Sequence, residues 1–496
     1  MIRDATIIGI LILISSMLKA NEEESSPNVI FILADDVGIG DIKCFYPPSK
    51  VTTNNIDRLA LEGIKFNQAY SPGATCSPSR YSLISGSYPC RGPLRSEAVN
   101  ATTPLTIREN ELSLPKFFKQ QGYRTAHIGK WHLGYGGEGG VTNWAGEIKP
   151  SANEIGFDYH FALPTNHNDG FKTYVENHSL LWLKDGVDEL PGKPAVEQLT
   201  QIRFDDLVES TLTEQGIAFI RENHDHPFFL YLAFTATHTH ITPHKKFRGS
   251  SEIGQLGDYI NELDFHVGEI MHTLEELGID ENTILFFSSD NGGSPRDHRT
   301  AGINLSLYDS SKGVREKAKT AKADANKKFG HLTNGMLRGS KGSNFEGGHR
   351  VPYIVRWPGR IAAGSESDQL ITLADTLATC AGLLNTRIPF QAGKDSFDLS
   401  PVMLGKEIEK PRAEVILQTN DGTLAFRQGS WKLHFLKPTV WQGEEPWLSA
   451  NCELYHLLTD PREERNLAAE QNERVKKMKE RLMNLLRAGR SSTLLR

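Results

Sequence analysis

The sequence predicts an α/β fold, in which a large mixed, mostly parallel sheet is sandwiched by helices and followed by a smaller C-terminal α+β subdomain built on a short antiparallel sheet. Two observations predict the large sheet: four apolar runs have the length of buried strands, and stretches of helical periodicity separate them. A third predicts the subdomain, because beyond Ser400 the strands become shorter and are joined by turns. We therefore divide the chain into a signal segment over 1–20, a main domain over 21–400 and a C-terminal subdomain over 401–496.

Each of the four apolar runs ends in polar residues. The runs cover residues 28–34, 123–129, 227–234 and 283–287. The polar residues that follow them are Asp35 and Asp36, Lys130 and His132, His238, and Asp290 and Asn291. In open parallel sheets the binding crevice lies at the carboxyl ends of the strands. The four ends therefore predict one shared site.

The chemistry expected at these ends differs from one to the next. Asp35-Asp36 in a glycine-rich loop is typical of hard-cation ligands, although a solvated turn has the same composition. Lys130 and His132 are two residues apart, so in an extended segment both point to the same side. One would supply a fixed cation there and the other a titratable base.

Helical periodicity predicts the connecting helices, and short turn-bounded runs predict the later strands. The expected helices cover residues 55–63, 112–121, 205–222, 257–277, 375–383 and 475–486, and the later strands 353–357, 415–418, 423–427 and 431–436. Residues 136–194, rich in Gly, Asn, Trp and His, are expected to form loops over the sheet edge. The candidates for substrate recognition there are His167, Asn168, Asp169 and Trp182, although an ordinary surface position is the simpler explanation for each of them.

Composition and charge narrow the class of protein. A net charge of −6 gives no basic field for nucleic acid, and 38% hydrophobic residues suit a core of normal size. The aliphatic run Ile7–Ile14, with Arg3 before it and Ala20 after it, predicts a signal peptide. The protein is then secreted or periplasmic, with no stable membrane insertion after cleavage. The run is shorter than the ~20 residues of a membrane span, and an uncleaved anchor is the alternative.

The decapeptide Ser71–Arg80 predicts a turn running into a helix, with Cys76 near the helix N-terminus. Unpaired backbone N–H groups there, together with Arg80 one turn on, favour a reactive thiolate beside an anion site. A packed or disulfide-bonded cysteine is the alternative. An exported protein can also pair the other cysteines, in a pattern that the sequence leaves open: Cys44, Cys90, Cys380 and Cys452.

Five segments resemble motifs of the type I sulfatases, the formylglycine-dependent, arylsulfatase-like family of the alkaline phosphatase superfamily. Cys76-Ser-Pro-Ser-Arg80 resembles the family's Cys-x-Pro-x-Arg motif. The other four are Gly129-Lys-Trp-His-Leu-Gly134, Ser289-Asp-Asn-Gly292, Arg338-Gly-Ser-Lys341 and Glu346-Gly-Gly-His-Arg-Val-Pro352. They follow the family's order, and the resemblance extends over residues 27–466.

This resemblance implies a sulfatase in which a maturation enzyme oxidises Cys76 to Cα-formylglycine (3-oxoalanine) and one calcium ion is bound. All-oxygen ligation favours calcium or magnesium over zinc. The implied metal ligands are Asp35, Asp36, Asp290, Asn291 and the modified Cys76. The implied catalytic residues are Cys76, Arg80, Lys130, His132, His238 and Lys341. The Phe-x-Ala-x-His spacing selects His238, but the stretched sequence that follows it leaves His240 as the alternative contact to the substrate.

The implied substrate is a sulfated saccharide or an aryl sulfate, and a secreted location favours the saccharide. Two other functions stay open: hydrolysis of phosphate or phosphonate esters, which the superfamily also performs, and binding of sulfated glycans without catalysis. A Lys- and Ala-rich insertion over 296–330 is expected to be a solvated helix or loop, with a clamp on a polyanionic substrate as the alternative.

Overall fold

The structure is a computed structural model that describes residues 26–94, 99–100, 102–137, 142–168, 173–181, 203–294, 329–419, 421–436 and 451–492. The predicted signal peptide, Asp169, Trp182 and nearly all of the 296–330 insertion lie outside these ranges. Among the helices described, none combines the length and the apolar composition that crossing a bilayer requires.

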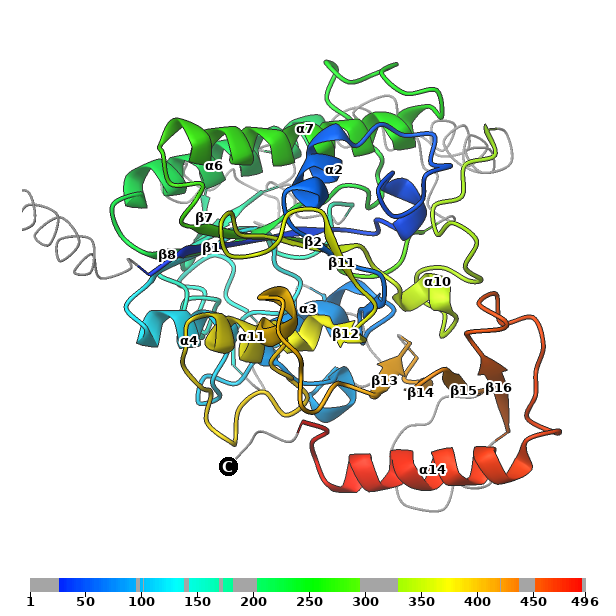
Figure 1. Ribbon diagram of the computed structural model, residues 1–496. Coiled ribbons are helices and arrows are strands. Elements are labelled where there is room, and N and C mark those ends of the chain that lie inside the picture. The colour runs from blue at the N-terminus through cyan, green and yellow to red at the C-terminus, as the bar shows by residue number, and fades with distance from the viewer. Residues whose placement is uncertain are drawn as a thin grey trace, which may run out of the picture.

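Ten strands form one large sheet (Figure 1). They are β1 Asn28–Ala34, β2 Ile64–Phe66, β4 Arg124–Lys130, β5 Tyr159–Leu163, β6 Val175–Glu176, β7 Ser179–Leu180, β8 Phe228–Ala233, β9 Thr283–Ser289, β10 Tyr353–Arg356 and β11 Ser365–Ser367. Their order across the sheet is β11-β2-β10-β9-β1-β8-β4-β5-β6-β7. The four predicted apolar runs form β1, β4, β8 and β9, which lie side by side and parallel, while β10 pairs antiparallel with β9. This confirms the predicted fold class.

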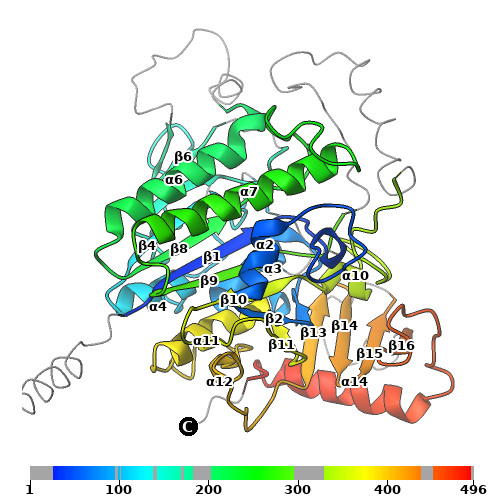
Figure 2. The same ribbon diagram turned by 45° about the horizontal axis from the view of Figure 1, so that its top comes forward.

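Helices cover both faces of the sheet. The α-helices of the described chain are α2 Asn54–Leu61, α3 Cys76–Ser85, α4 Leu114–Gln120, α6 Val208–Asn223, α7 Gln255–Glu276, α10 Glu346–His349, α11 Thr376–Leu383, α12 Ser400–Met403 and α14 Asn472–Arg487. α2, α6 and α7 lie on one face, and α3, α4 and α11 lie on the other (Figure 1 and Figure 2). A separate two-stranded sheet pairs β3 Ala69–Tyr70 with β12 Ile371–Thr372.

The packing of the central strand β1 on both of its faces explains why its sequence is apolar throughout. Phe31 and Leu33 pack in the core that contains residues of α3, α4 and α11. Ile30 and Ile32 pack in the core on the opposite face, with residues of α2, α6 and α7. Because successive side chains of a strand point to opposite faces, a strand covered on both faces needs apolar residues at every position.

The prediction of loops over 136–194 is wrong for part of that segment. Strand β5 pairs in parallel with β4, and β6 and β7 extend the sheet edge beyond it. The sequence of β5 does not indicate a strand, because His160 interrupts a short apolar run. That imidazole is buried, where Nδ1 lies 2.9 Å from Nδ1 of His127 and Nε2 lies 2.9 Å from the hydroxyl of Tyr135.

The C-terminal region forms a four-stranded antiparallel sheet, with α14 beside it (Figure 1). Its strands are β13 Glu414–Gln418, β14 Leu424–Gln428, β15 Trp431–Phe435 and β16 Cys452–His456. Met478 and Leu482 of α14 pack on Phe426 and Leu433 of the sheet, which explains the apolar stripe of this helix. Of the cysteines, Cys44, Cys76, Cys380 and Cys452 are free thiols in this structure.

A buried ionic cluster joins this sheet to helix α10 and strand β3. Lys432 of β15 lies 2.9 Å from a carboxylate oxygen of Glu346 in α10 and 3.1 Å from one of Glu463. Glu463 also accepts the backbone N–H of Glu346 at 2.6 Å and lies 2.8 Å from Nε2 of His434. Burial opposes ionisation of Glu346, but Lys432 and other cations bring its pKa well below the ordinary value. We name these residues the C-terminal cluster: Tyr70, Glu346, Arg350, Lys432, His434 and Glu463.

Candidate active site

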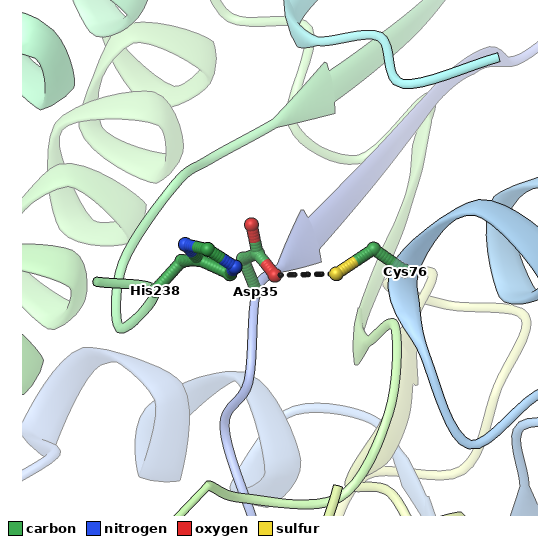
Figure 3. A group of neighbouring side chains, drawn as sticks. All are labelled: Asp35, Cys76 and His238. Carbon is green, nitrogen blue, oxygen red and sulfur yellow. Dashed lines mark hydrogen bonds between the residues drawn. The ribbon is translucent and has the colours of Figure 1, made fainter. Parts of the chain in front are cut away.

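The carboxyl ends of β1, β8 and β9 meet the N-terminus of α3 at one edge of the large sheet. Figure 3 shows three of the side chains there, Asp35, Cys76 and His238, and one ligand atom of each lies within 4.8 Å of the others. Asp36 and Asp290 belong to an overlapping group with Asp35 and Cys76 at the same spacing. The structure therefore brings together residues that are widely separated in the sequence.

Three buried carboxylates pair with three cations at this edge, and Arg80 also lies 3.7 Å from Asp35. The nitrogen–oxygen contacts are Lys130–Asp35 at 2.5 Å, Lys341–Asp36 at 2.6 Å and Arg80–Asp290 at 2.9 Å. Burial by itself would raise the pKa of Asp35, but Lys130 brings it below the ordinary value, and Lys341 does the same for Asp36. The formal charges cancel within this strand-end cluster, which consists of Asp35, Asp36, Asp290, Arg80, Lys130 and Lys341.

The turn before α3 places Cys76 in this cluster. The hydroxyl of Ser79 donates to the carbonyl of Gly73 at 2.8 Å, so the first turn of the helix is tied to the turn that precedes it. A side chain at Gly73 would put its Cβ 2.7 Å from Cβ of Pro78, which explains why glycine stands there. Arg80, one turn later, is fully buried and donates to the backbone carbonyl of Lys130 at 2.7 Å.

The expectation of a Cys76 thiolate is wrong for the unmodified side chain. Burial raises the pKa of Cys76 to about 12, and the charge of Asp35 adds to this effect. Lys130 and Lys341 act in the opposite direction but do not outweigh it. The thiol is therefore neutral, with Sγ 3.5 Å from Oδ1 of Asp35 and 3.2 Å from Nζ of Lys341.

Asn291 has an amide oxygen that lacks a partner. Its Nδ2 donates to Oδ1 of Asp36 at 2.8 Å and to the carbonyl of Gly292 at 2.9 Å. Its Oδ1 is buried and has no hydrogen-bond partner within the described residues. A buried acceptor without a partner costs about 1–3 kcal/mol, so the position favours a bound cation. With the three carboxylates it makes an all-oxygen donor set, and these residues therefore fit the calcium ion that the resemblance implies.

His132 does not lie in the extended segment that the sequence predicts, because its φ is +55°. Its Nε2–H donates to the carbonyl of Val99 at 3.0 Å, and its Nδ1 is buried with no partner in the described part of the chain. Burial lowers the pKa of His132 well below the ordinary value, and Lys130 lowers it further. The imidazole is therefore neutral, with an acceptor nitrogen held out of water.

The two histidines after β8 are placed differently. His238 belongs to the group within 4.8 Å of Asp35 and Cys76, and of the described residues His240 is outside that group. Nδ1–H of His238 donates to the carbonyl of Thr239 at 2.7 Å. Burial lowers the pKa of His238 to about 4, and Lys341 and Lys130 contribute to the shift. The geometry favours His238 over His240 as the site residue.

Of the candidates in the sheet-edge loops, His167 lies on the segment that follows β5. Its Nε2 lies 2.9 Å from the hydroxyl of Thr242, and its carbonyl accepts a hydrogen bond from Arg203 at 3.0 Å. His167 is buried, whereas Asn168 is exposed. His167 therefore supports the segment after His240.

Sequence reasoning missed the residues that hold the site loops together. Asn334 exchanges two hydrogen bonds with the backbone of Gly293, at 2.8 and 3.0 Å. Gln418 at the end of β13 pairs through its backbone with the turn before Cys76, on both sides of Gly73. A Cβ at Gly292 would lie 2.0 Å from the carbonyl oxygen of Gly347, so two family-like motifs touch through glycines. None of these contacts has a local sequence signal, because the partners are far apart in the chain.

Comparison with known proteins shows which family this chain is similar to. A family profile described as Sulfatase matches residues 27–386. An N-acetylgalactosamine-6-O-sulfatase of Bacteroides thetaiotaomicron is 33% identical, with 94% of each chain covered. The N-acetylgalactosamine-6-sulfatase of Rattus norvegicus is 32% identical over 85% of this chain and 72% of its own.

Solved structures share the fold. One, from a study of the metabolism of multiple glycosaminoglycans by Bacteroides thetaiotaomicron, has a TM-score of 0.77 at 30% identity and covers 93% of this chain and 99% of its own. A sulfatase from Pseudoalteromonas sp. has a TM-score of 0.70 at 25% identity and covers 96% and 92%. The chain belongs to the sulfatase family of sulfuric ester hydrolases.

Proposed function

We propose that the protein hydrolyses sulfate esters of saccharides with a formylglycine derived from Cys76 and one calcium ion. The ion would be bound by Asp35, Asp36, Asp290 and Asn291, together with the modified residue 76. The observation that carries this proposal is the unpartnered Oδ1 of Asn291 beside three carboxylates and Cys76. When bound, the calcium ion would supply a Lewis acid for a sulfate oxygen. The hydrated formylglycine would supply a geminal diol, in which one hydroxyl attacks and the second remains for the release of sulfate.

The cations of the strand-end cluster bind the sulfuryl group. Arg80, Lys130 and Lys341 already balance the three carboxylates, so a divalent ion gives the site a net positive charge that suits an anionic ester. Positive charge fixed in a buried site stabilises the negative charge that develops on the sulfuryl oxygens in the transition state. His132 accepts a proton at Nδ1, because that nitrogen is neutral and unpartnered in the described structure.

Two groups are placed to give a proton to the departing alcohol. Burial opposes the charge of Lys341, but Asp36 raises its pKa well above the ordinary value, so this amine carries a proton. His238 holds its proton on Nδ1, which donates to the carbonyl of Thr239, so its Nε2 first takes a proton from Lys341 and then gives it to the ester oxygen. His240 stays the alternative contact to the substrate.

The names of the relatives indicate which substrate to test first. Curated proteins at 31–33% identity are named N-acetylgalactosamine-6-sulfatases or the 6-O-sulfatase, from Bacteroides thetaiotaomicron and from mammals. A 6-sulfate of an N-acetylhexosamine is therefore the first substrate we propose. Export through residues 1–20 would place the enzyme where sulfated glycans occur.

The test is to express the protein with a formylglycine-generating enzyme and measure the peptide mass around Cys76. Replacing CH2–SH by CHO lowers the mass by about 18 Da, and this modified residue is the proposed nucleophile. The Cys44 peptide of the same digest is the internal control and keeps the mass of a thiol. Sulfate release from N-acetylgalactosamine 6-sulfate is then followed with and without a chelator, and calcium is expected to restore activity after chelation.

Three results would contradict the proposal. A Cys76 peptide that keeps the thiol mass under these conditions would favour the glycan-binding alternative. Hydrolysis of phosphate or phosphonate esters, without hydrolysis of any sulfate ester, would favour the other hydrolase chemistry. Full activity in excess chelator would remove the metal from the mechanism.

A further inference from the structure

The segment that carries His238 is held at both ends by buried carboxylates. Glu209, in the first turn of α6, accepts the backbone N–H of Thr235 at 3.1 Å and also its hydroxyl. Glu209 further accepts the hydroxyl of Tyr259 from α7 at 2.9 Å. Glu262 of α7 accepts the backbone N–H of His244 at 2.8 Å. The two helices over this face of the sheet thus each contribute one carboxylate to the loop after β8.

The path from Glu209 to His238 is short. The carbonyl of Thr235 accepts the backbone N–H of His238 at 2.7 Å, so the residue that Glu209 binds closes the turn in which His238 stands. The same turn is bonded to the metal-ligand strand, because the carbonyl of Ala236 accepts the N–H of Asp35 at 2.9 Å. The direction of the imidazole relative to Asp35 therefore depends on how this turn is held.

Glu209 does this without a cationic partner. It is 1% exposed, and no Lys or Arg forms an ion pair with it within the residues that the structure describes. Burial raises the pKa of Glu209 to about 7, with a contribution from Glu262, and burial raises that of Glu262 to about 8. Two buried carboxylates with which no Lys or Arg of the described residues pairs are unfavourable for folding, and such arrangements gather at functional sites.

We propose that Glu209 is a positioning residue that, through Thr235, orients His238 toward the oxygen of the departing alcohol. This rests on the proposed function, in which His238 exchanges a proton with that oxygen. An alkoxide leaving group needs the proton, whereas a nitrophenolate is stable enough to leave without it. The loss of activity in a variant that misorients His238 is therefore expected to depend on the leaving group.

The experiment compares a saccharide 6-sulfate with 4-nitrophenyl sulfate for each variant of the modified, calcium-loaded enzyme. General acid catalysis contributes about 10²–10⁴-fold, so His238→Ala should lose that much on the saccharide and far less on the aryl ester. For Glu209→Gln we expect kcat on the saccharide to fall about 10- to 100-fold, with little change on the aryl ester and in either KM.

Thr235 offers a matched pair of variants that tests the same contact independently of how Glu209→Gln folds. Thr235→Val removes the hydroxyl at constant shape and should show the leaving-group-dependent loss, and Thr235→Ser keeps the hydroxyl and should restore the wild-type ratio. Equal losses of Glu209→Gln and Thr235→Val on both esters, or no loss, would overturn the positioning role while His238→Ala still shows the selective loss. If His238→Ala itself is not selective, the role proposed for His238 fails instead.

Discussion

The strand-end cluster and the C-terminal cluster are both buried and ionic, but they differ in how completely their polar atoms are paired. In the C-terminal cluster Lys432 is shared by Glu346 and Glu463, and within the described residues no buried side-chain nitrogen or oxygen of this cluster lacks a partner. Beside the strand-end cluster, Oδ1 of Asn291 and Nδ1 of His132 are both buried without one.

This difference indicates which cluster serves the stability of the fold and which serves catalysis. Buried polar groups in folded proteins are nearly always hydrogen-bonded, so a fully paired network is explained by stability alone. Unpartnered atoms beside a balanced set of charges fit the ion and the proton that the proposed function assigns to them. We therefore expect substitutions in the strand-end site to remove activity and substitutions in the C-terminal cluster to remove stability.

The largest effect is expected for Cys76→Ser. Serine keeps one hydroxyl but has no second hydroxyl to release sulfate, so each molecule should complete at most one turnover. The steady-state rate should fall at least about 10³-fold, since the activated nucleophile is lost. The thermal unfolding midpoint should stay close to that of the wild type, because Cys76 makes only weak hydrogen bonds. Sustained turnover by this variant would reject the formylglycine mechanism, and Cys90→Ser is the control that should retain activity.

The second effect is expected in the C-terminal cluster. Lys432→Met leaves Glu346 and Glu463 buried without their shared cation, which should cost about 3–5 kcal/mol of unfolding free energy. The kcat, measured well below the unfolding midpoint, should remain near that of the wild type. Denaturant unfolding and steady-state kinetics check both statements. Lys476→Met on the exposed face of α14 is the matched control and should change stability by less than about 0.5 kcal/mol.

If Lys432→Met instead lost activity while fully folded, the division between the two clusters would be wrong. The arrangement of Lys341 would then depend on the C-terminal sheet more directly than the contacts indicate.

A third effect follows from Glu209, which has Tyr259, Glu262 and His266 around it. Its pKa is about 7 in the folded protein and near 4.5 when unfolded, so the folded state alone holds the proton between these values. The resulting stability is fully present below pH 4.5 and is lost as pH rises through 7. Relative to Glu209→Gln, the wild type should therefore lose about 3 kcal/mol from pH 4.5 to pH 8. Urea unfolding of both proteins at the two pH values checks this, and a difference independent of pH would contradict it.

The smallest effect is expected at the surface of the same helix pair. Arg221 of α6 and Glu276 of α7 form an ion pair at 2.6 Å, with side chains 50% and 44% exposed. Exposed pairs contribute little to stability, and salt screens them. Arg221→Ala should therefore change the unfolding free energy least among these variants, and the change should shrink in high salt. A larger loss would mean that α6 and α7 are joined mainly at their surface.

Much of the fold and of the site is predictable from local sequence. The apolar runs of β1, β4, β8 and β9 need no partner to be recognised, because burial on both faces requires apolar residues at every position. The polar residues at their ends predict the shared site for a similar reason, since parallel strands end at one edge. The short strand β5 was missed because His160 is buried by tertiary contacts that no local pattern reveals.

What the sequence by itself determined is which residue types stand where: the order of the strands' polar ends, the Cys76 motif and the family. Only the tertiary structure decided which charges meet, for example Lys341 with Asp36, 305 residues apart. It also decided that the Cys76 thiol is neutral and that Glu209 binds the turn of His238. The physical reason is that secondary structure follows from neighbouring residues, whereas ion pairing, burial and pKa depend on groups that only the folded chain brings together.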